Sequence, residues 1–83
     1  MLDGNAAAGV LREVFAADMT MAFTSCAGCG TTYQLGELRL FASAMGMILR
    51  CPSCDMAMLR VGNIPNGYWL DLRGVQVIKV ARA

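Results

Sequence analysis

The stretch CAGCG at residues 26–30 is echoed by CPSCD at residues 51–55, and together they hold all four cysteines of the chain. In each stretch two residues separate the cysteines, which lets a tight turn aim both sulfurs at one point. Gly30 permits the positive φ that such a turn commonly needs, and Pro52 and Ser53 suit the second turn. We therefore expect two cysteine knuckles.

The spacing between the two pairs is close to that of four-cysteine zinc sites, with 21 residues (30–50) between them. Because the chain has no histidine, such a site consists of cysteine alone. A site with four protein ligands is closed, and a closed zinc site is structural rather than catalytic. The predicted ligands of one zinc ion are Cys26, Cys29, Cys51 and Cys54. Iron on the same four thiolates is the alternative.

Two disulfides, free core thiols or a redox pair are the competing interpretations of the cysteines. The first twenty residues lack the basic start and unbroken apolar run of a signal peptide, so we expect a cytoplasmic protein, where structural disulfides are rare. No apolar run is long enough to predict a membrane span. A thioredoxin-like redox pair requires a helix, whereas Gly30 and Asp55 follow the two pairs and strand patterns come next.

The composition is that of one small folded domain: 83 residues, 57% apolar and 16% charged. This is more apolar than so short a chain easily hides, so either the core is unusually rich in small Ala and Met side chains or some surface meets a partner. The formal charge of +1 falls to −1 when four thiolates hold a divalent cation. Such a charge disfavours nucleic acid and anionic membranes as partners, without excluding nucleic acid.

The chain changes character near residue 19. Residues 3–18 predict one helix that Asp3 or Asn5 caps and that packs through Leu11 and Phe15. The remaining residues predict short strands separated by turn signals. The expected strands are 19–24, 37–42, 46–51, 56–61, 68–72 and 75–80.

These elements predict an α+β fold, an N-terminal helix followed by a small antiparallel zinc-ribbon β-sheet. We expect a helical segment over residues 1–18 and a zinc ribbon with a C-terminal β-hairpin extension over 19–83, within a single domain. The extension is the hairpin of residues 68–80.

CAGCGTTY and LRCPSCD look like the two knuckles of a zinc ribbon, a resemblance that covers residues 19–62. The whole chain also resembles a family of short, uncharacterised, mainly actinobacterial proteins. The resemblance rests on the LDGNAAAG start, the knuckles CAGCG and LRCPSC, and the GYWLDLRG tail at 67–74. It implies metal binding at the four cysteines and no particular activity.

The knuckles are also similar to those of rubredoxin, in which iron on four thiolates carries an electron. Here Asp55 stands where a glycine usually ends the second knuckle, which puts its sulfur-directed N–H groups in doubt. The chain also lacks the strongly acidic surface of rubredoxins. We therefore favour zinc, and a rubredoxin-like iron electron carrier is an alternative function.

Tyr68 and Trp69 are neighbours on a predicted strand and must point to opposite faces. Either Trp69 is exposed as an anchor for a protein partner, or it packs on the N-terminal helix. The methionines cluster around the knuckles and suit either core filling or an adaptable binding surface. We predict a small protein-interaction module that uses Trp69, Tyr68 and a methionine-rich surface.

Arginines on the predicted strands leave a nucleic-acid-associated zinc ribbon as a further alternative. The weak excess of basic over acidic residues and the few aromatic residues argue against it, and solvated strand faces with edge-strand protection explain these arginines better. These arginines are Arg39, Arg50, Arg60 and Arg73. No histidine, activated serine or carboxylate pair points to catalysis, so we do not expect an enzyme.

Overall fold

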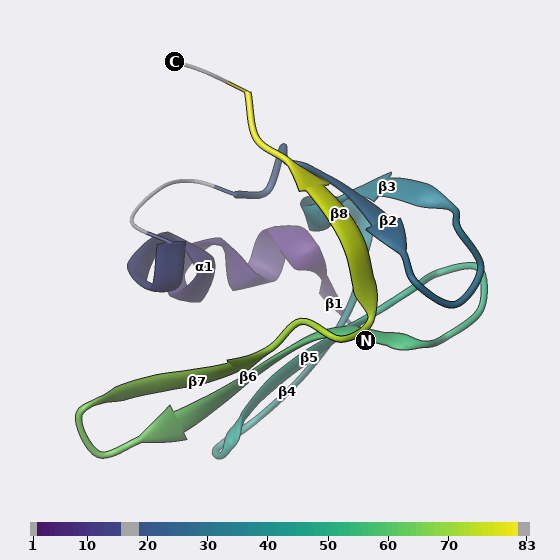
Figure 1. Ribbon diagram of the computed structural model, residues 1–83. Helices are drawn as coiled ribbons and strands as arrows, with labels where there is room; N and C mark the ends of the chain where they lie inside the picture. The colour runs from purple at the N-terminus through teal and green to yellow at the C-terminus, as the bar shows by residue number, and fades with distance from the viewer. Residues whose placement is uncertain (1, 16–18, 82–83) are drawn as a thin grey trace.

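The computed structural model describes residues 2–15 and 19–81, and the fold is α+β with two antiparallel sheets and an N-terminal helix (Figure 1). This class agrees with the expectation from sequence. In chain order the elements are β1 (Leu2–Asp3), η1 (Gly4–Ala7), α1 (Ala8–Phe15), β2 (Phe23–Cys26), β3 (Thr32–Gln34), η2 (Leu35–Glu37), β4 (Arg39–Ser43), β5 (Gly46–Arg50), β6 (Ala57–Ile64), β7 (Gly67–Asp71) and β8 (Val75–Lys79).

The larger sheet has five strands in the order β1-β4-β5-β6-β7. Two tight hairpins build most of it, β4–β5 around residues 44–45 and β6–β7 around residues 65–66. Strands were expected on both sides of each turn, over 37–42 and 46–51 and over 56–61 and 68–72. At the first hairpin Gly46 has φ +149, and a side chain there would overlap the Val61 carbonyl. Glycine is therefore required where β5 starts beside β6.

The smaller sheet has three strands in the order β3-β2-β8, so the expected 68–80 hairpin is wrong. β7 pairs with β6, whereas β8 pairs with β2 in the other sheet. Between them the chain turns at residues 72–75, where the Val75 N–H donates to the Leu72 carbonyl at 3.0 Å. β8 thereby covers the open edge of β2, and Val75 and Ile78 pack against the core.

The single helix expected over residues 3–18 is also wrong in part. Residues 2–3 pair with β4 as a short strand, and one 3-10 turn precedes the α-helix of Ala8–Phe15. Asp3 does cap this segment, because its carboxylate accepts the Asn5 N–H at 3.1 Å. Gly4 contacts the backbone of η2, where any side chain would overlap the Leu35 carbonyl. The expected helix end and the boundary at residue 18 lie outside the described residues.

The strand expected over 19–24 starts later, at Phe23, and ends at Cys26. Before it the chain turns, with the Ala22 N–H donating to the Met19 carbonyl at 3.0 Å, and this turn buries both side chains. The strand Thr32–Gln34 was not expected. It forms because the first knuckle folds the chain back along β2.

The core lies between the two sheets and α1, which sits on the same side of the larger sheet as the smaller one (Figure 1). Tyr68 donates its hydroxyl hydrogen bond to Glu13 and so ties β7 to the helix. The largest fully buried apolar side chains are Leu11, Leu35, Leu38, Leu49, Met58 and Leu59. The expectation that methionines fill the core is confirmed for Met19, Met47 and Met58, whereas Met21 and Met45 are exposed.

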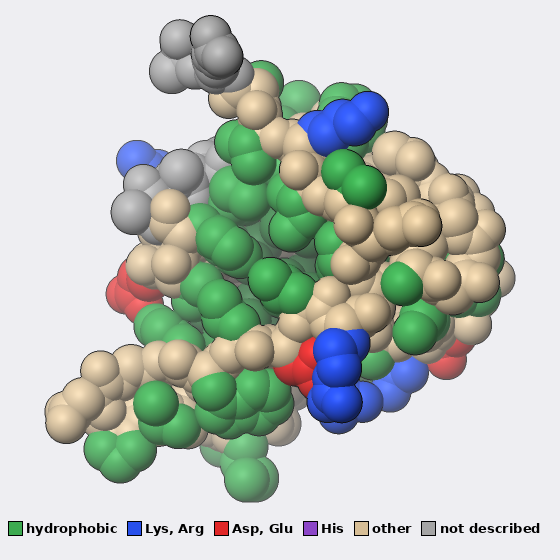
Figure 2. All heavy atoms as spheres, viewed as in Figure 1, with side chains coloured by type: hydrophobic (Ala, Val, Ile, Leu, Met, Phe, Trp, Pro, Cys, Tyr) green, Lys and Arg blue, Asp and Glu red, His purple; other side chains and the backbone are tan. Residues whose placement is uncertain are grey.

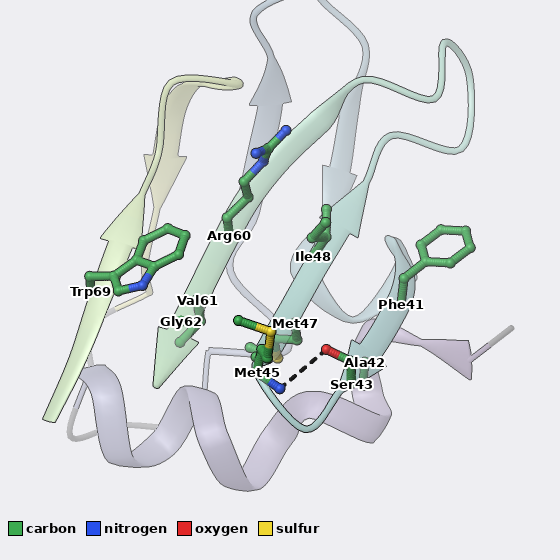
Figure 3. Close-up of a pocket in the computed structure, with 11 residues that line it drawn as sticks. Phe41, Ala42, Ser43, Met45, Met47, Ile48, Arg60, Val61, Gly62 and Trp69 are labelled. Carbon is green, nitrogen blue, oxygen red and sulfur yellow. Dashed lines mark hydrogen bonds between the residues drawn. The ribbon is translucent and has the colours of Figure 1, made fainter. Parts of the chain in front are cut away.

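Trp69 points away from α1, as Tyr68 on the helix side requires, and packing of Trp69 on the helix is therefore excluded (Figure 3). It is 47% exposed. Among the described residues, no helix combines the length and apolar character needed to cross a membrane.

Candidate metal centre

The four cysteines come together in one cluster, with all four Sγ atoms within 4.8 Å of one another. The shortest distances join opposite knuckles: Cys26 to Cys54 is 3.5 Å and Cys29 to Cys51 is 3.7 Å. Four sulfurs about 2.3 Å from one zinc ion would stand about 3.8 Å apart in a tetrahedron. A disulfide needs about 2.05 Å, and all four cysteines are free. The sulfurs are therefore spaced for a cation and not for disulfides.

The first knuckle is a backbone loop closed by two hydrogen bonds. The Gly30 N–H donates to the Cys26 carbonyl at 2.8 Å, and the Cys26 N–H donates to the Thr31 carbonyl at 3.0 Å. Gly30 has φ +76, as expected for the residue that ends the turn. The Gly28 N–H points at Cys26 Sγ from 3.3 Å. Such a donor stabilises a thiolate.

The second knuckle repeats this pattern. The Asp55 N–H donates to the Cys51 carbonyl at 2.8 Å, and the Cys51 N–H donates to the Met56 carbonyl at 2.9 Å. Asp55 takes the place of Gly30 with φ +64, a left-handed conformation that aspartate tolerates better than most residues. The loop therefore closes as the first one does, and the N–H group that reaches a sulfur of this knuckle is that of Met56, which hydrogen-bonds to Cys54.

Both knuckles begin at an irregularity in a sheet. The pairing register shifts between Ser25 and Cys26 on β2 and between Leu49 and Arg50 on β5. Such bulges turn a strand and redirect its side chains. The first cysteine of each pair, Cys26 or Cys51, is consequently buried, while the second is exposed.

Contacts outside the sulfurs hold the knuckles in place. The Ala27 N–H donates to the Gly74 carbonyl at 2.9 Å, which anchors the first knuckle to the turn before β8. Tyr33 Oη lies 2.6 Å from Ser53 Oγ, which joins β3 to the second knuckle. Arg50 donates to the Asp55 carbonyl at 3.0 Å. The site is thus attached to both sheets without any metal contact.

Electrostatics differ between the two exposed sulfurs. Hydrogen bonds from the Thr31 side chain and backbone lower the pKa of Cys29 from 9.0 to about 6. A backbone hydrogen bond from Met56 lowers the pKa of Cys54, but desolvation and the three neighbouring sulfurs outweigh it and raise that pKa to about 12. Four thiolates so close together repel one another, and a bound cation relieves that repulsion.

Three contacts at the site were not anticipated from sequence. A side chain on Gly28 would stand 2.7 Å from Met56 Sδ, so glycine lets the second knuckle approach the first. Thr31 Oγ1 lies 3.3 Å from Cys29 Sγ. The third is the Tyr33–Ser53 link. The glycine between the two cysteines was a visible signal for the first contact, whereas the others depend on which loops meet.

These features define a class of protein, a small α+β domain in which two cysteine knuckles form one four-sulfur cluster. The chain belongs to a family described as "Family of unknown function (DUF6510)", which matches residues 1–83. No curated protein and no solved structure matches the chain. The expected membership of an uncharacterised family is confirmed, and the chemistry of the site has to come from its geometry.

Proposed function

We propose that Cys26, Cys29, Cys51 and Cys54 hold one structural zinc ion and that the chain is a zinc-ribbon protein. The observation that carries this proposal is the meeting of four sulfurs within 4.8 Å from two loops with the same backbone hydrogen bonds. Thiolates are ligands that zinc prefers, and four of them complete its usual coordination. A site filled by protein ligands leaves no position for a substrate, so the proposed role is not enzymatic.

The zinc ion would connect the β2–β3 hairpin of one sheet to the β5–β6 hairpin of the other. Zinc coordination contributes about 10 kcal/mol or more to the folding of such domains. A core of this size supplies less than that after the cost of chain ordering. The metal therefore stabilises the arrangement of the two sheets. Reduced thiolates suit a cytoplasmic location.

Substitution of one ligand tests the proposal. Cys29→Ser, or removal of zinc by a chelator, is expected to unfold most of residues 19–62, and circular dichroism measures the loss. Met45→Ser is the matched control, because Met45 is 83% exposed on a turn away from the cluster. A spectrum that chelator leaves unchanged contradicts the proposal.

Iron on the same sulfurs is the second candidate, as in a rubredoxin-like electron carrier. The observation in its favour is that backbone N–H groups serve the sulfurs of both knuckles, since hydrogen bonds to sulfur tune the potential of an iron site. A purified protein that is red and absorbs visible light supports iron. A colourless protein that contains zinc rejects it.

We further propose that the metal-stabilised fold serves as a protein-interaction module. Trp69 is half-exposed on the face of the larger sheet that neither α1 nor the smaller sheet covers. Tryptophan is enriched among the residues that dominate binding energies at interfaces. A partner captured by the native protein should be lost with Trp69→Ala, and retention of that partner rejects this role for Trp69.

A further inference from the structure

The face of the larger sheet opposite α1, called the outer face below, is built from aligned rows of residues. One row joins Phe41, Ile48, Arg60 and Asp71 across four strands. The neighbouring row joins Ser43, Gly46, Gly62 and Trp69. Two glycines thus occupy the middle of the second row, with large side chains around them.

This arrangement leaves an apolar hollow of about 300 Å³ on the outer face (Figure 3). Phe41, Ile48 and Trp69 are among its lining residues. A side chain on Gly62 would overlap the indole and stand 2.5 Å from Trp69 Cζ2. The indole therefore lies across the glycine, with part of its surface open to solvent. Such a hollow fits one bulky apolar side chain of a partner.

A second, basic cleft of about 470 Å³ adjoins the hollow, and Arg60 lines both. Arg50 and Arg73 also line it, together with one acidic residue, Asp71. Arg73 pairs with Asp71 at 2.7 Å, and Arg60 lies opposite the same aspartate on the next strand, so the cleft has an excess of two positive charges. Figure 2 shows basic side chains gathered beside the turn between β7 and β8, next to the hydrophobic side chains over β7.

We propose that the outer face binds an acidic peptide segment with one bulky apolar anchor. The anchor occupies the hollow beside Trp69, and carboxylates one or more residues away pair with Arg60 and Arg50. The inference rests on the protein-interaction role proposed above and names the chemistry of the partner. Its basis is charge complementarity, because this face carries Arg39, Arg50 and Arg60, with Arg73 in the turn after β7, against two aspartates, Asp3 opposite Arg39 and Asp71 opposite Arg60.

A peptide fits these observations better than single-stranded nucleic acid. Nucleic-acid grooves combine many cations along a backbone track with a series of stacking aromatics. Among the residues that line the hollow, only Phe41 and Trp69 are aromatic, and they lie on β4 and β7 with two strands between them. The exposed Met45 adds aliphatic surface to the hollow, which suits an aliphatic or aromatic side chain.

The experiment selects binders from a randomised, tryptophan-free peptide library on the zinc-loaded protein. Enriched peptides should combine acidic residues with one bulky apolar residue. Trp69 is the only tryptophan of the chain, so its fluorescence reports binding directly. Arg60→Gln should weaken the affinity about tenfold, and raising the salt concentration should weaken it as well.

Variants separate the hollow from general effects. Gly62→Ala should weaken binding because it displaces the indole, whereas Gly67→Ala, with open space around its new methyl group, should not. Arg12→Gln on α1 is the control for loss of a positive charge and should leave the affinity unchanged.

Four results would overturn the inference: enrichment of neutral or basic peptides, no enrichment at all, affinity that Arg60→Gln and Gly62→Ala leave intact, or tighter binding of a single-stranded DNA oligonucleotide. Metal content and circular dichroism are measured first on the same sample. A folded, zinc-loaded protein without acidic selectivity overturns this inference alone, whereas a folded metal-free protein overturns the proposed zinc site.

Discussion

Gly74→Ala should destabilise the protein strongly, because Gly74 lies where the chain leaves one sheet for the other. A methyl group there would overlap the Ala57 carbonyl and stand 2.5 Å from Met58 Cα, where an ordinary contact is 3.4–4 Å. Both neighbours are backbone atoms of β6, so no flexible side chain can move aside. Gly74 is also buried and accepts the hydrogen bond from Ala27 in the first knuckle.

The magnitude follows from two contributions. Overpacking of a well-filled site costs about 1–3 kcal/mol. Weakening of the Ala27–Gly74 hydrogen bond adds about 1 kcal/mol. We therefore expect a loss of about 3 kcal/mol in the free energy of unfolding. For a domain of this size that corresponds to a fall of roughly 12–24 °C in the melting temperature.

The assay is thermal unfolding followed by circular dichroism at a fixed, saturating zinc concentration. Gly67→Ala is the matched control, because its methyl group meets no atom within 4 Å and should change stability by less than about 1 kcal/mol. Equal melting temperatures for the two variants would refute the reasoning about how β7 connects to β8.

Two further predictions concern the second knuckle and the helix. Asp55→Gly should stay within about 1 kcal/mol of the native protein, whereas Asp55→Val should lose about 2 kcal/mol, because φ +64 suits glycine and opposes a branched side chain; equal urea midpoints would contradict this. The hydrogen bond to Glu13 raises the pKa of Tyr68 above its ordinary 10.0. The contribution of this hydrogen bond to the stability of the fold is therefore present below pH 10 and is lost as the pH rises through the raised pKa of Tyr68. In a Tyr33→Phe variant, the midpoint of the ultraviolet titration of Tyr68 should shift to lower pH when Glu13→Ala is added. An unchanged midpoint would count against the Tyr68–Glu13 contact.

The features that sequence predicts well here are local. A two-residue gap between cysteines, a glycine after the pair and a Pro-Asn turn each act over a few residues, and the knuckles and the turn between β6 and β7 follow from them. The convergence of the two knuckles is also predictable, because a four-sulfur site needs both. The repeated hydrogen bonds around Gly30 and Asp55 show why the spacing carries so much information.

The errors concern contacts between distant segments. Residues 75–79 have the same strand pattern whether they pair with β7 or with β2. Only the packing of Val75 and Ile78 on the core decides which of the two strands they pair with. Likewise, Leu2–Asp3 becomes a strand because β4 offers it an edge. The hollow beside Trp69 depends on Gly46 and Gly62 meeting across β5 and β6, which no short window of sequence reveals.

The central claim is that one zinc ion on four thiolates holds the two sheets together. Elemental analysis and native mass spectrometry of protein purified under reducing conditions without added metal test it most directly. We predict one zinc per chain and loss of the fold when that zinc is removed. A compact chain that contains no metal, with its sulfurs oxidised to disulfides or free to react without unfolding, would contradict the account.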